Sequence, residues 1–538
     1  MATVDSSDYH ETNVSSDMRI LHTSEQNSQA DLTGRHNMAR NVLGSWMCQM
    51  AFVVVGFVLP RIVDRRIGQE SLGIWDLGWS VEAYLGLASF GIVGAISQHI
   101  AQARAARNME MLRATASIGM LLYLCTGTLV AILTVGVTYF TPMLFGERLG
   151  ENVTDAQWVI CLVGISLAVE FYTAVFAGVL TGCHQWIWHN GIASGVHLVT
   201  ATGMIIAVLL GSGLRAMAGI TLVGKVTAGV LRLLVAYWRC PGLSISPRYI
   251  RRDMALGMLG YGSKSMLYIV ASVFMRETTR VMVLGYLGPA ALAVYSRPLA
   301  LVNQSAAFST RFAHVFAPTA SAYQATRSVH QLRELMITGG RYALYFFLPI
   351  VIVLTISGRY LLRLWMGDRY DSGIVLAILA IGNLPILFQL ANMEIIRGMN
   401  RHGLPSLAFI GLAAIGIPIA ALVLGYLGWG ITGGALAAVV PQALLYGIFI
   451  PVYACRLVGL PVAKYLMKTV PGPVMANVPL ALSLLASRML WPNSIAANLL
   501  GGLSVGALFL GIVYWNRVVP MRIKARVFSF IGLRGAVA

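Results

Sequence analysis

The strongest constraint in this sequence is a series of apolar runs that recurs from residue 41 almost to the C-terminal end. A helix of about 20 apolar residues crosses the hydrocarbon core of a bilayer, which is ~30 Å thick. The composition agrees, because 57% of the residues are hydrophobic and only 11% are charged, against roughly 45–50% and 25% in soluble domains. The sequence therefore predicts an all-α polytopic membrane protein.

We expect about fourteen transmembrane helices. They are predicted at residues 41–61, 73–99, 114–140, 157–182, 190–211, 216–238, 263–286, 292–318, 341–358, 372–396, 405–425, 430–454, 471–490 and 495–516. Residues 1–38 are rich in Ser, Asp and Asn and are predicted to form a disordered cytoplasmic tail. Residues 517–538 are predicted to form a second, basic cytoplasmic tail.

The distribution of positive charge predicts the orientation in the membrane. Loops on the side of the N-terminus carry 23 Lys and Arg residues, and loops on the opposite side carry 9. Cytoplasmic loops are the ones enriched in Lys and Arg, so both termini are predicted to be cytoplasmic. The net charge of +18 is too scattered for a nucleic-acid surface, and the loop charges are expected to meet anionic membrane lipids.

An internal repeat divides the membrane part into two halves. Ile67 to Trp75 (IGQESLGIW) recurs as Leu287 to Tyr295 (LGPAALAVY), and further matches follow in the same order at shifts between 214 and 221. These matches pair Phe145–Glu147 with Met366–Asp368, Gly182 with Gly398, Gly211 with Gly425 and Gly219 with Gly433. Two parallel repeats of six helices are an architecture of transporters with alternating access.

The repeat predicts the domain organisation. We expect an N-terminal six-helix bundle at 39–240, a cytoplasmic linker at 241–262, a C-terminal six-helix bundle at 263–456 and two extra helices within 457–516.

The same motifs resemble those of a known family. The Arg-rich end of the first helix, the two repeat loops, Leu364 to Tyr370 (LWMGDRY) and Gly428 to Gly433 (GWGITG) look like the polysaccharide exporters of the multidrug/oligosaccharidyl-lipid/polysaccharide superfamily, which includes MATE and MurJ. The resemblance covers about residues 40–515. It implies a flippase of undecaprenyl-pyrophosphate-linked oligosaccharide in the bacterial inner membrane, with polysaccharide polymerase or export machinery as partners.

Basic residues inside the predicted helices are the candidate substrate site. A polar stripe about 160° wide follows the helix at 263–286, and a second, about 140° wide, follows the helix at 292–318. The candidate ligands of a pyrophosphate and its sugars are Lys264, Arg276, Arg280, Arg297, Gln304 and Arg311. The structural alternative is that these bases are neutralised, Arg280 by Glu277 and Arg297 by reaching the outer surface.

Carboxylates inside the membrane are candidates for coupling to protons or Na⁺. These are Asp76, Glu82, Glu170, Glu277 and Glu394. Glu170 is the first choice because no basic residue lies within four positions of it, whereas Glu394 has Arg397 three residues later. Asp76, near an outer helix end, is interpreted as solvated.

The sequence lacks the motifs of enzymes, ATP-driven pumps and metalloproteins. The sequence has no phosphate loop, no nucleophile triad and no metal-ligand spacing, and its six cysteines lie in or beside apolar runs. We therefore expect no cofactor, no metal and no enzyme activity. The alternatives that stay open are a cation-coupled multidrug antiporter of the same superfamily and a membrane glycosyltransferase or polymerase.

Overall fold

The computed structural model describes residues 38–517, apart from residues 90, 241, 314–315 and 493. The two predicted tails lie outside this range except for Met38 and Arg517 at their inner ends. Every regular element of the described chain is a helix, as the apolar runs predict.

The helices of the first half follow one another with short connections. They are α2 (Met38–Arg66), α3 (Gln69–Leu85), α4 (Ile92–Ala105), α5 (Met109–Leu149), α6 (Val153–Gly182), α7 (Trp186–Leu209) and α8 (Leu214–Arg239).

The second half contains α9 (Arg252–Leu287), α10 (Pro289–Ala313), α11 (Phe316–Ala325), α12 (Val329–Ile356), α13 (Gly358–Met366), α14 (Gly373–Gly398), α15 (Gly403–Ala421), α16 (Gly430–Leu444) and α17 (Ile450–Leu457). The chain continues with α18 (Val462–Thr469), α19 (Pro471–Leu490) and α20 (Ile495–Arg517).

Within the described residues, nine helical stretches are long and apolar enough to cross a membrane, or ten if the bent pair α3 and α4 counts as one span. One of the nine, Met109–Gly182, contains both α5 and α6. The helices α2, α9 and α10, with 29, 36 and 25 residues, are also long enough to span. The prediction of fourteen spans is consistent with these helices, but the hydropathy test alone does not fix that number.

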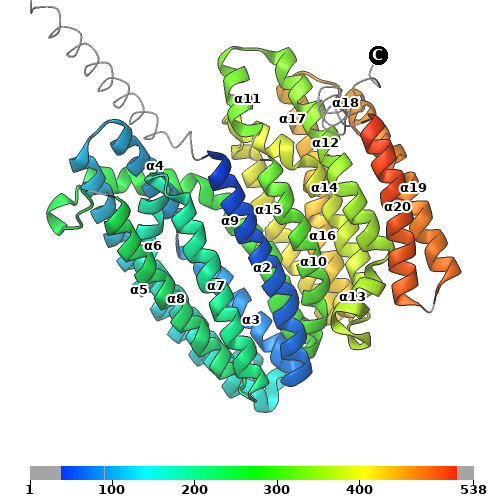
Figure 1. The fold of residues 1–538 in the computed structure, drawn as a ribbon, viewed down its shortest axis with the longest axis horizontal. Helices are drawn as coiled ribbons and strands as arrows, with labels where there is room; N and C mark the ends of the chain where they lie inside the picture. Colours follow the sequence, from blue (N-terminus) through cyan, green and yellow to red (C-terminus); the bar gives the residue numbers. More distant parts are fainter. Residues whose placement is uncertain (1–37, 90, 241, 314–315, 493, 518–538) are drawn as a thin grey trace, which may run out of the picture. The chain divides into compact units, whose positions relative to one another are not determined.

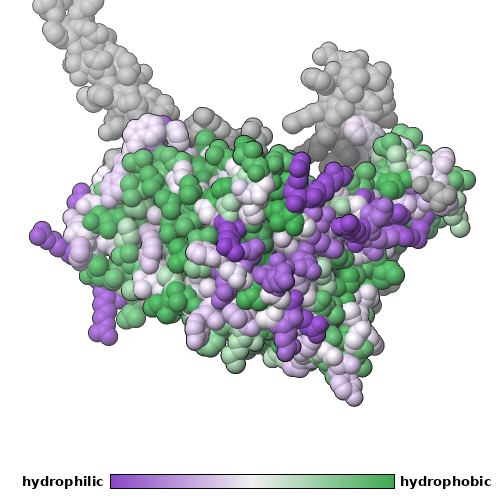
Figure 2. Space-filling view, turned by 90° about the horizontal axis from the view of Figure 1, so that it is seen from below, coloured by the Kyte–Doolittle hydropathy of each residue, from purple (hydrophilic) through white to green (hydrophobic). Residues whose placement is uncertain are grey.

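Large apolar side chains lie on the surface of many helices. Figure 2 shows broad hydrophobic areas, and residues such as Met143, Leu210 and Met489 are at least 80% exposed. A soluble monomer rarely carries apolar patches of this extent. Lipid chains are the surroundings that these side chains require.

The described helices group into two compact units. The first contains the chain up to Gly68, Val81–Leu144 and Glu151–Met266, and the second contains Gln69–Ser80, Phe145–Gly150 and the chain from Leu267 onward. The first half of α3 thus groups with the helices of the second repeat, although in sequence it belongs to the first. Figure 1 shows the long helices of each unit lying alongside one another.

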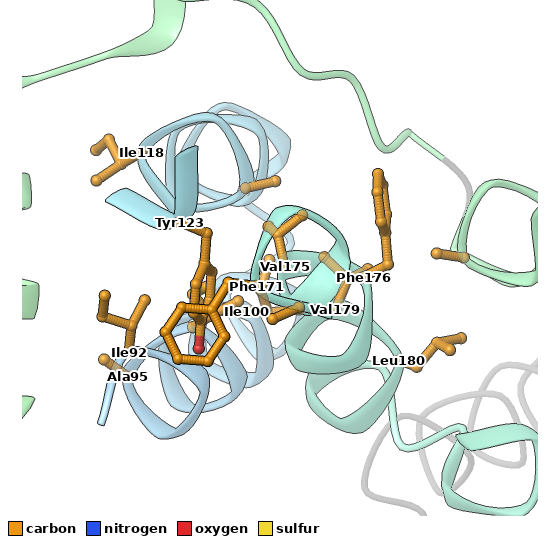
Figure 3. Packing of buried hydrophobic residues seen from close by; sticks show 14 of the residues in the cluster. Ile92, Ala95, Ile100, Ile118, Tyr123, Phe171, Val175, Phe176, Val179 and Leu180 are labelled. Carbon is orange, nitrogen blue, oxygen red and sulfur yellow. The ribbon is translucent and has the colours of Figure 1, made fainter. Parts of the chain in front are cut away.

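The core of the first unit lies where α4, α5 and α6 meet. Small and β-branched residues allow the close approach, as Figure 3 shows for Ile92, Ile100 and Val175 around Tyr123 and Phe171. The rings of Tyr123 and Phe171 meet at an interplanar angle of 67° with centroids 5.8 Å apart, which is a favourable edge-to-face arrangement.

Left-handed backbone residues recur at matched positions of the two halves. Gly68 and Gly288 have φ of 104° and 88°, and Arg107 and Arg327 both have φ of 52°. The turns after α6 and α14 contain His184 and Asn400, with φ of 57° and 54°. Non-glycine residues seldom adopt positive φ, so shifts of 220, 220 and 216 indicate a true structural repeat.

Each repeat contains one arginine that donates hydrogen bonds to the backbone of the turn at the end of that repeat. Arg113 on α5 donates Nε to the carbonyl of Gly242, 3.0 Å away, in the turn after α8. Arg333 on α12 donates Nε to the carbonyl of Val458 at 2.7 Å and a terminal nitrogen to Gly459 at 3.0 Å, in the turn after α17. Each arginine thus ties the start of the third helix of its repeat to the end of the sixth.

Two details of the sequence interpretation were wrong. Phe145–Glu147 was matched to Met366–Asp368, but Gly146 lies inside α5, whereas Gly367 forms the turn after α13 with φ of 98°. In addition, α9 begins at Arg252 rather than near residue 263. The first turn of α9 carries Arg252 and Asp253, and Gly257, Gly260 and Gly262 follow. Charged residues and glycines weaken the hydropathy and helix signals, so the sequence predicts a linker here.

Candidate functional site

A cavity of about 290 Å³ lies inside the second unit, among α9, α10, α14, α15 and α16. Its polar lining comes from Ser272, Arg276, Tyr295, Asn303, Asn383, Glu394, Arg397, Gln442 and Tyr446. Two of the predicted site residues, Arg276 and Glu394, therefore meet at one cavity. A concave, mostly apolar pocket with a few convergent polar groups is the usual form of a ligand site.

Arg276 is the basic residue that α9 presents to this cavity. Its side chain is 46% exposed, and its Nε donates to Oε1 of Glu277, 3.1 Å away. That bond leaves the two terminal amino groups for a ligand, and this is the fork with which arginine binds phosphate oxygens.

Arg280 has a structural partner, as the alternative interpretation proposed. Its Nη1 donates to Glu277 Oε2 at 2.8 Å, and Ser80 of α3 donates to the same oxygen at 3.1 Å. The Glu277 side chain is only 5% exposed. Glu277 thus neutralises Arg280, binds Arg276 and holds α3 to α9.

Arg297 is also paired, and its partner is not the one expected. Its Nη2 lies 2.5 Å from both carboxylate oxygens of Asp76 on α3, and both side chains are largely buried. The interpretation of Asp76 as a solvated residue was wrong, because α3 buries it against α10. Arg297 does not need to reach the outer surface.

The remaining predicted ligands are less informative. Gln304 lies on α10 and is half-buried. The backbones of Lys264 and Arg311 lie in α9 and α10, but their side chains lie outside the described residues.

Glu394 and Arg397 form the ion pair that their spacing predicts. Arg397 Nη1 donates to Glu394 Oε1 at 2.8 Å on one face of α14. Both residues line the cavity, so the pair contributes local charge to the pocket without adding net charge.

A second cluster of buried charge lies in the first unit, and sequence reasoning missed its composition. Lys225 of α8 donates to Glu170 of α6 and, at 3.4 Å, to Oε1 of Glu82 on α3. Arg232, two turns further along α8, lies 3.8 Å from the other oxygen of Glu170. Spacing could have placed Lys225 and Arg232 on one helix face, but not opposite Glu170, which is 55 residues away from Lys225.

Two ion pairs hold the shape of the LWMGDRY turn. Arg359 makes a bidentate pair with Asp371, and Arg363 pairs with Asp368. The hydrogen bond to Asp371 raises the pKa of Arg359 above its ordinary value. These exposed pairs fix the turn after α13 and are not candidate ligands.

The described residues hold no group of three or more His, Cys, Asp or Glu side chains that could bind a metal ion.

Two family models match the sequence, "Polysaccharide biosynthesis protein" over residues 189–375 and "MatE" over residues 46–199. No curated protein matches it.

Several solved structures share its architecture. An inward-facing multidrug resistance MATE family transporter of the MOP superfamily is 17% identical, with a TM-score of 0.65, covering 75% of this chain and 94% of its own. The lipid II flippase MurJ in an inward closed conformation is 12% identical, with a TM-score of 0.61, covering 89% of this chain and 100% of its own. The fold is that of the MOP superfamily transporters. A MOP superfamily transporter from Pyrococcus furiosus is 17% identical, with a TM-score of 0.54, covering 78% of this chain and 95% of its own.

The MurJ likeness extends over more of the chain than the MATE likeness, 89% against 75%. The prediction of a MATE/MurJ-like all-α fold is confirmed.

Proposed function

We propose that this protein flips an undecaprenyl-pyrophosphate-linked oligosaccharide across the bacterial cytoplasmic membrane by alternating access. The product would feed exopolysaccharide, capsule or O-antigen synthesis. The observation that carries the proposal is Arg276, a partly exposed arginine at the cavity inside the second unit. The polysaccharide biosynthesis model supports it, because its match includes all of α9 and α10.

The chemistry of the cavity suits a charged, hydroxylated ligand. Pyrophosphate oxygens require charge-assisted hydrogen bonds when they leave water, and arginine supplies two in parallel. Asn383 and Gln442 line the cavity, and each donates its amide nitrogen to a carbonyl one turn earlier, at 2.9 and 3.0 Å. Their amide oxygens are the acceptors that they would offer to sugar hydroxyls. The buried hydroxyl of Tyr295 has no hydrogen-bond partner among the described residues and supplies a further donor.

Charge reversal of Arg276 tests the proposal. Arg276→Glu is expected to lower export by about 30-fold or more, since losing a desolvated charged contact costs about 2–5 kcal/mol. Polysaccharide is measured in a deletion strain that expresses the variant, together with lipid-linked intermediates. The intermediates should accumulate on the cytoplasmic face, and Arg276→Lys should retain part of the activity.

Arg369→Glu is the matched control, because Arg369 is an exposed arginine of the same unit in the turn after α13. This variant is expected to export normally. Normal export by Arg276→Glu at wild-type protein levels would contradict the proposed site.

A multidrug antiporter is the second candidate, and the MatE match over residues 46–199 is the observation that favours it. The two functions differ in the phenotype of a deletion strain. The flippase loses surface polysaccharide and keeps its drug susceptibility, whereas the antiporter becomes more susceptible to cationic drugs and keeps its polysaccharide.

We also propose that both termini face the cytoplasm. A fluorescent protein fused after Ala538 should fluoresce, and alkaline phosphatase fused at the same position should be inactive, because the charge bias places this end with the 23 basic loop residues. Active phosphatase would reverse the orientation.

A further inference from the structure

We propose that Glu82 is a proton-binding site in the first unit and that the proton it binds is the ion coupled to transport. The site consists of Glu82, Glu170, Lys225 and Arg232, called here the charge tetrad. The tetrad was not predicted as a unit, and its location differs from that of the cavity in the second unit.

The tetrad is balanced in charge but not in contacts. One carboxylate oxygen of Glu170 pairs with Lys225, and the other lies 3.8 Å from Arg232. Among the described residues, the cation paired with Glu82 is Lys225, at the longer distance of 3.4 Å. Lys225 lies between two carboxylates, and it binds Glu170 more closely.

Glu82 is the carboxylate with an unused oxygen. Its Oε2 is buried and has no hydrogen-bond partner among the described residues, and the residue is 9% exposed. A buried charged oxygen without a partner carries a full desolvation penalty. Protonation of Glu82 removes that penalty and leaves Lys225 bound to Glu170, so the remaining ion pairs stay intact.

The tetrad is not fully enclosed by the helices. The side chains of Lys225 and Glu170 are 25% and 30% exposed, whereas the Glu82 side chain is 11% exposed. Lys225 and Glu170 are therefore the polar groups through which a proton would reach Glu82.

The other titratable groups around the tetrad do not replace Glu82. Tyr123 on α5 lies within electrostatic range of Glu170, His189 on α7 within range of Arg232, and His197 on α7 within range of Lys225. His197 also stacks on Phe52 with ring centroids 4.1 Å apart. Lys225 and Arg232 repel a further positive charge on either imidazole, so a carboxylate is the acceptor.

Proton binding changes the charge of a helix contact inside the unit. With Glu82 ionised, Lys225 links α8 to both α3 and α6; with Glu82 neutral, it links α8 to α6 alone. A change of one ion pair that alters which helices are joined is the local event that a two-state transporter can use.

Infrared difference spectroscopy on the purified protein in liposomes tests the proton site without any substrate. The wild type should gain a protonated-carboxyl band as the pH falls from about 8 to about 5, because a buried carboxyl group takes up a proton more readily than an exposed one. Glu82→Gln should lose this band. Glu277→Gln is the matched control and should keep it, because Glu277 already has Ser80, Arg276 and Arg280 as partners.

Glu82→Asp shows whether a lost band reflects a lost carboxyl group or a folding defect. This variant keeps a carboxyl group at the same position and should show a titrating band. A band that persists in Glu82→Gln, or a wild type without any titrating band in this range, would overturn the proton site.

Coupling is tested by flipping of a fluorescent undecaprenyl-pyrophosphate sugar in proteoliposomes, and this arm rests on the proposed function. A pH gradient should accelerate the wild type several-fold and leave Glu82→Gln at the rate seen without a gradient. Flipping that ignores the gradient in the wild type would overturn coupling. No flipping at all by the wild type would overturn the proposed substrate, and the infrared result would still decide the proton site.

Discussion

Replacing Arg297 by methionine is expected to destabilise the protein by about 3–5 kcal/mol, which is the usual cost of removing one partner of a buried ion pair. Asp76 would keep its charge in the interior of the second unit without a cation, since Arg297 Nη2 contacts both of its oxygens. Thermal unfolding in detergent, followed by tryptophan fluorescence, should show a clearly lower Tm.

The double variant Arg297→Met with Asp76→Leu separates the charge from the packing. It is expected to recover most of the lost stability, because a buried pair replaced by apolar side chains is often neutral. Arg215→Met is the matched control; its partner Asp155 is exposed, and such surface pairs contribute about 0–1 kcal/mol. Equal stabilities of Arg297→Met and Arg215→Met would show that the Asp76 pair is not buried in the membrane-embedded protein.

Replacing Gly73 by alanine is the second change with a large expected effect. A Cβ on Gly73 would lie 1.8 Å from the backbone oxygen of Pro289, where α3 begins alongside α10. Backbone cannot move aside as a side chain can, so the cost should reach or exceed the ~1–3 kcal/mol typical of overpacking. Size-exclusion chromatography of a fluorescent fusion should show aggregated or degraded protein.

Gly136→Ala on α5 is the matched control, because its Cβ would meet nothing within 4 Å. Alanine is favoured over glycine in a helix by about 1 kcal/mol, so this variant should be at least as stable as the wild type. A symmetric wild-type elution peak for Gly73→Ala would mean that the two repeat loops are further apart than the structure places them.

The helices could be predicted from sequence because their apolar runs satisfy a local rule. The predicted spans 157–182 and 471–490 agree closely with α6 and α19. Helix ends interrupted by charges and glycines, such as the eleven residues 252–262 at the start of α9, carry a weaker signal.

For the candidate site, the ion pairs that could be predicted are those whose two residues are close together in the sequence. The pairs of Glu277 with Arg280 and of Glu394 with Arg397 are three residues apart on one helix face and could be predicted. Asp76 and Arg297 are 221 residues apart, and Lys225 and Glu82 are 143 apart. Their contacts depend on tertiary packing, which no spacing rule gives.

Arg113 and Arg333 are among the 23 basic loop residues whose distribution predicts the orientation of the chain. Both guanidinium groups also donate to carbonyls in the turns that end their repeats. Removing either arginine would therefore change both the charge that orients the chain and the hydrogen bonds that hold the turn. Lysine keeps the charge but not the fork of donors, so arginine-to-lysine exchange at these two sites is the way to learn which of the two roles assembly of the protein requires.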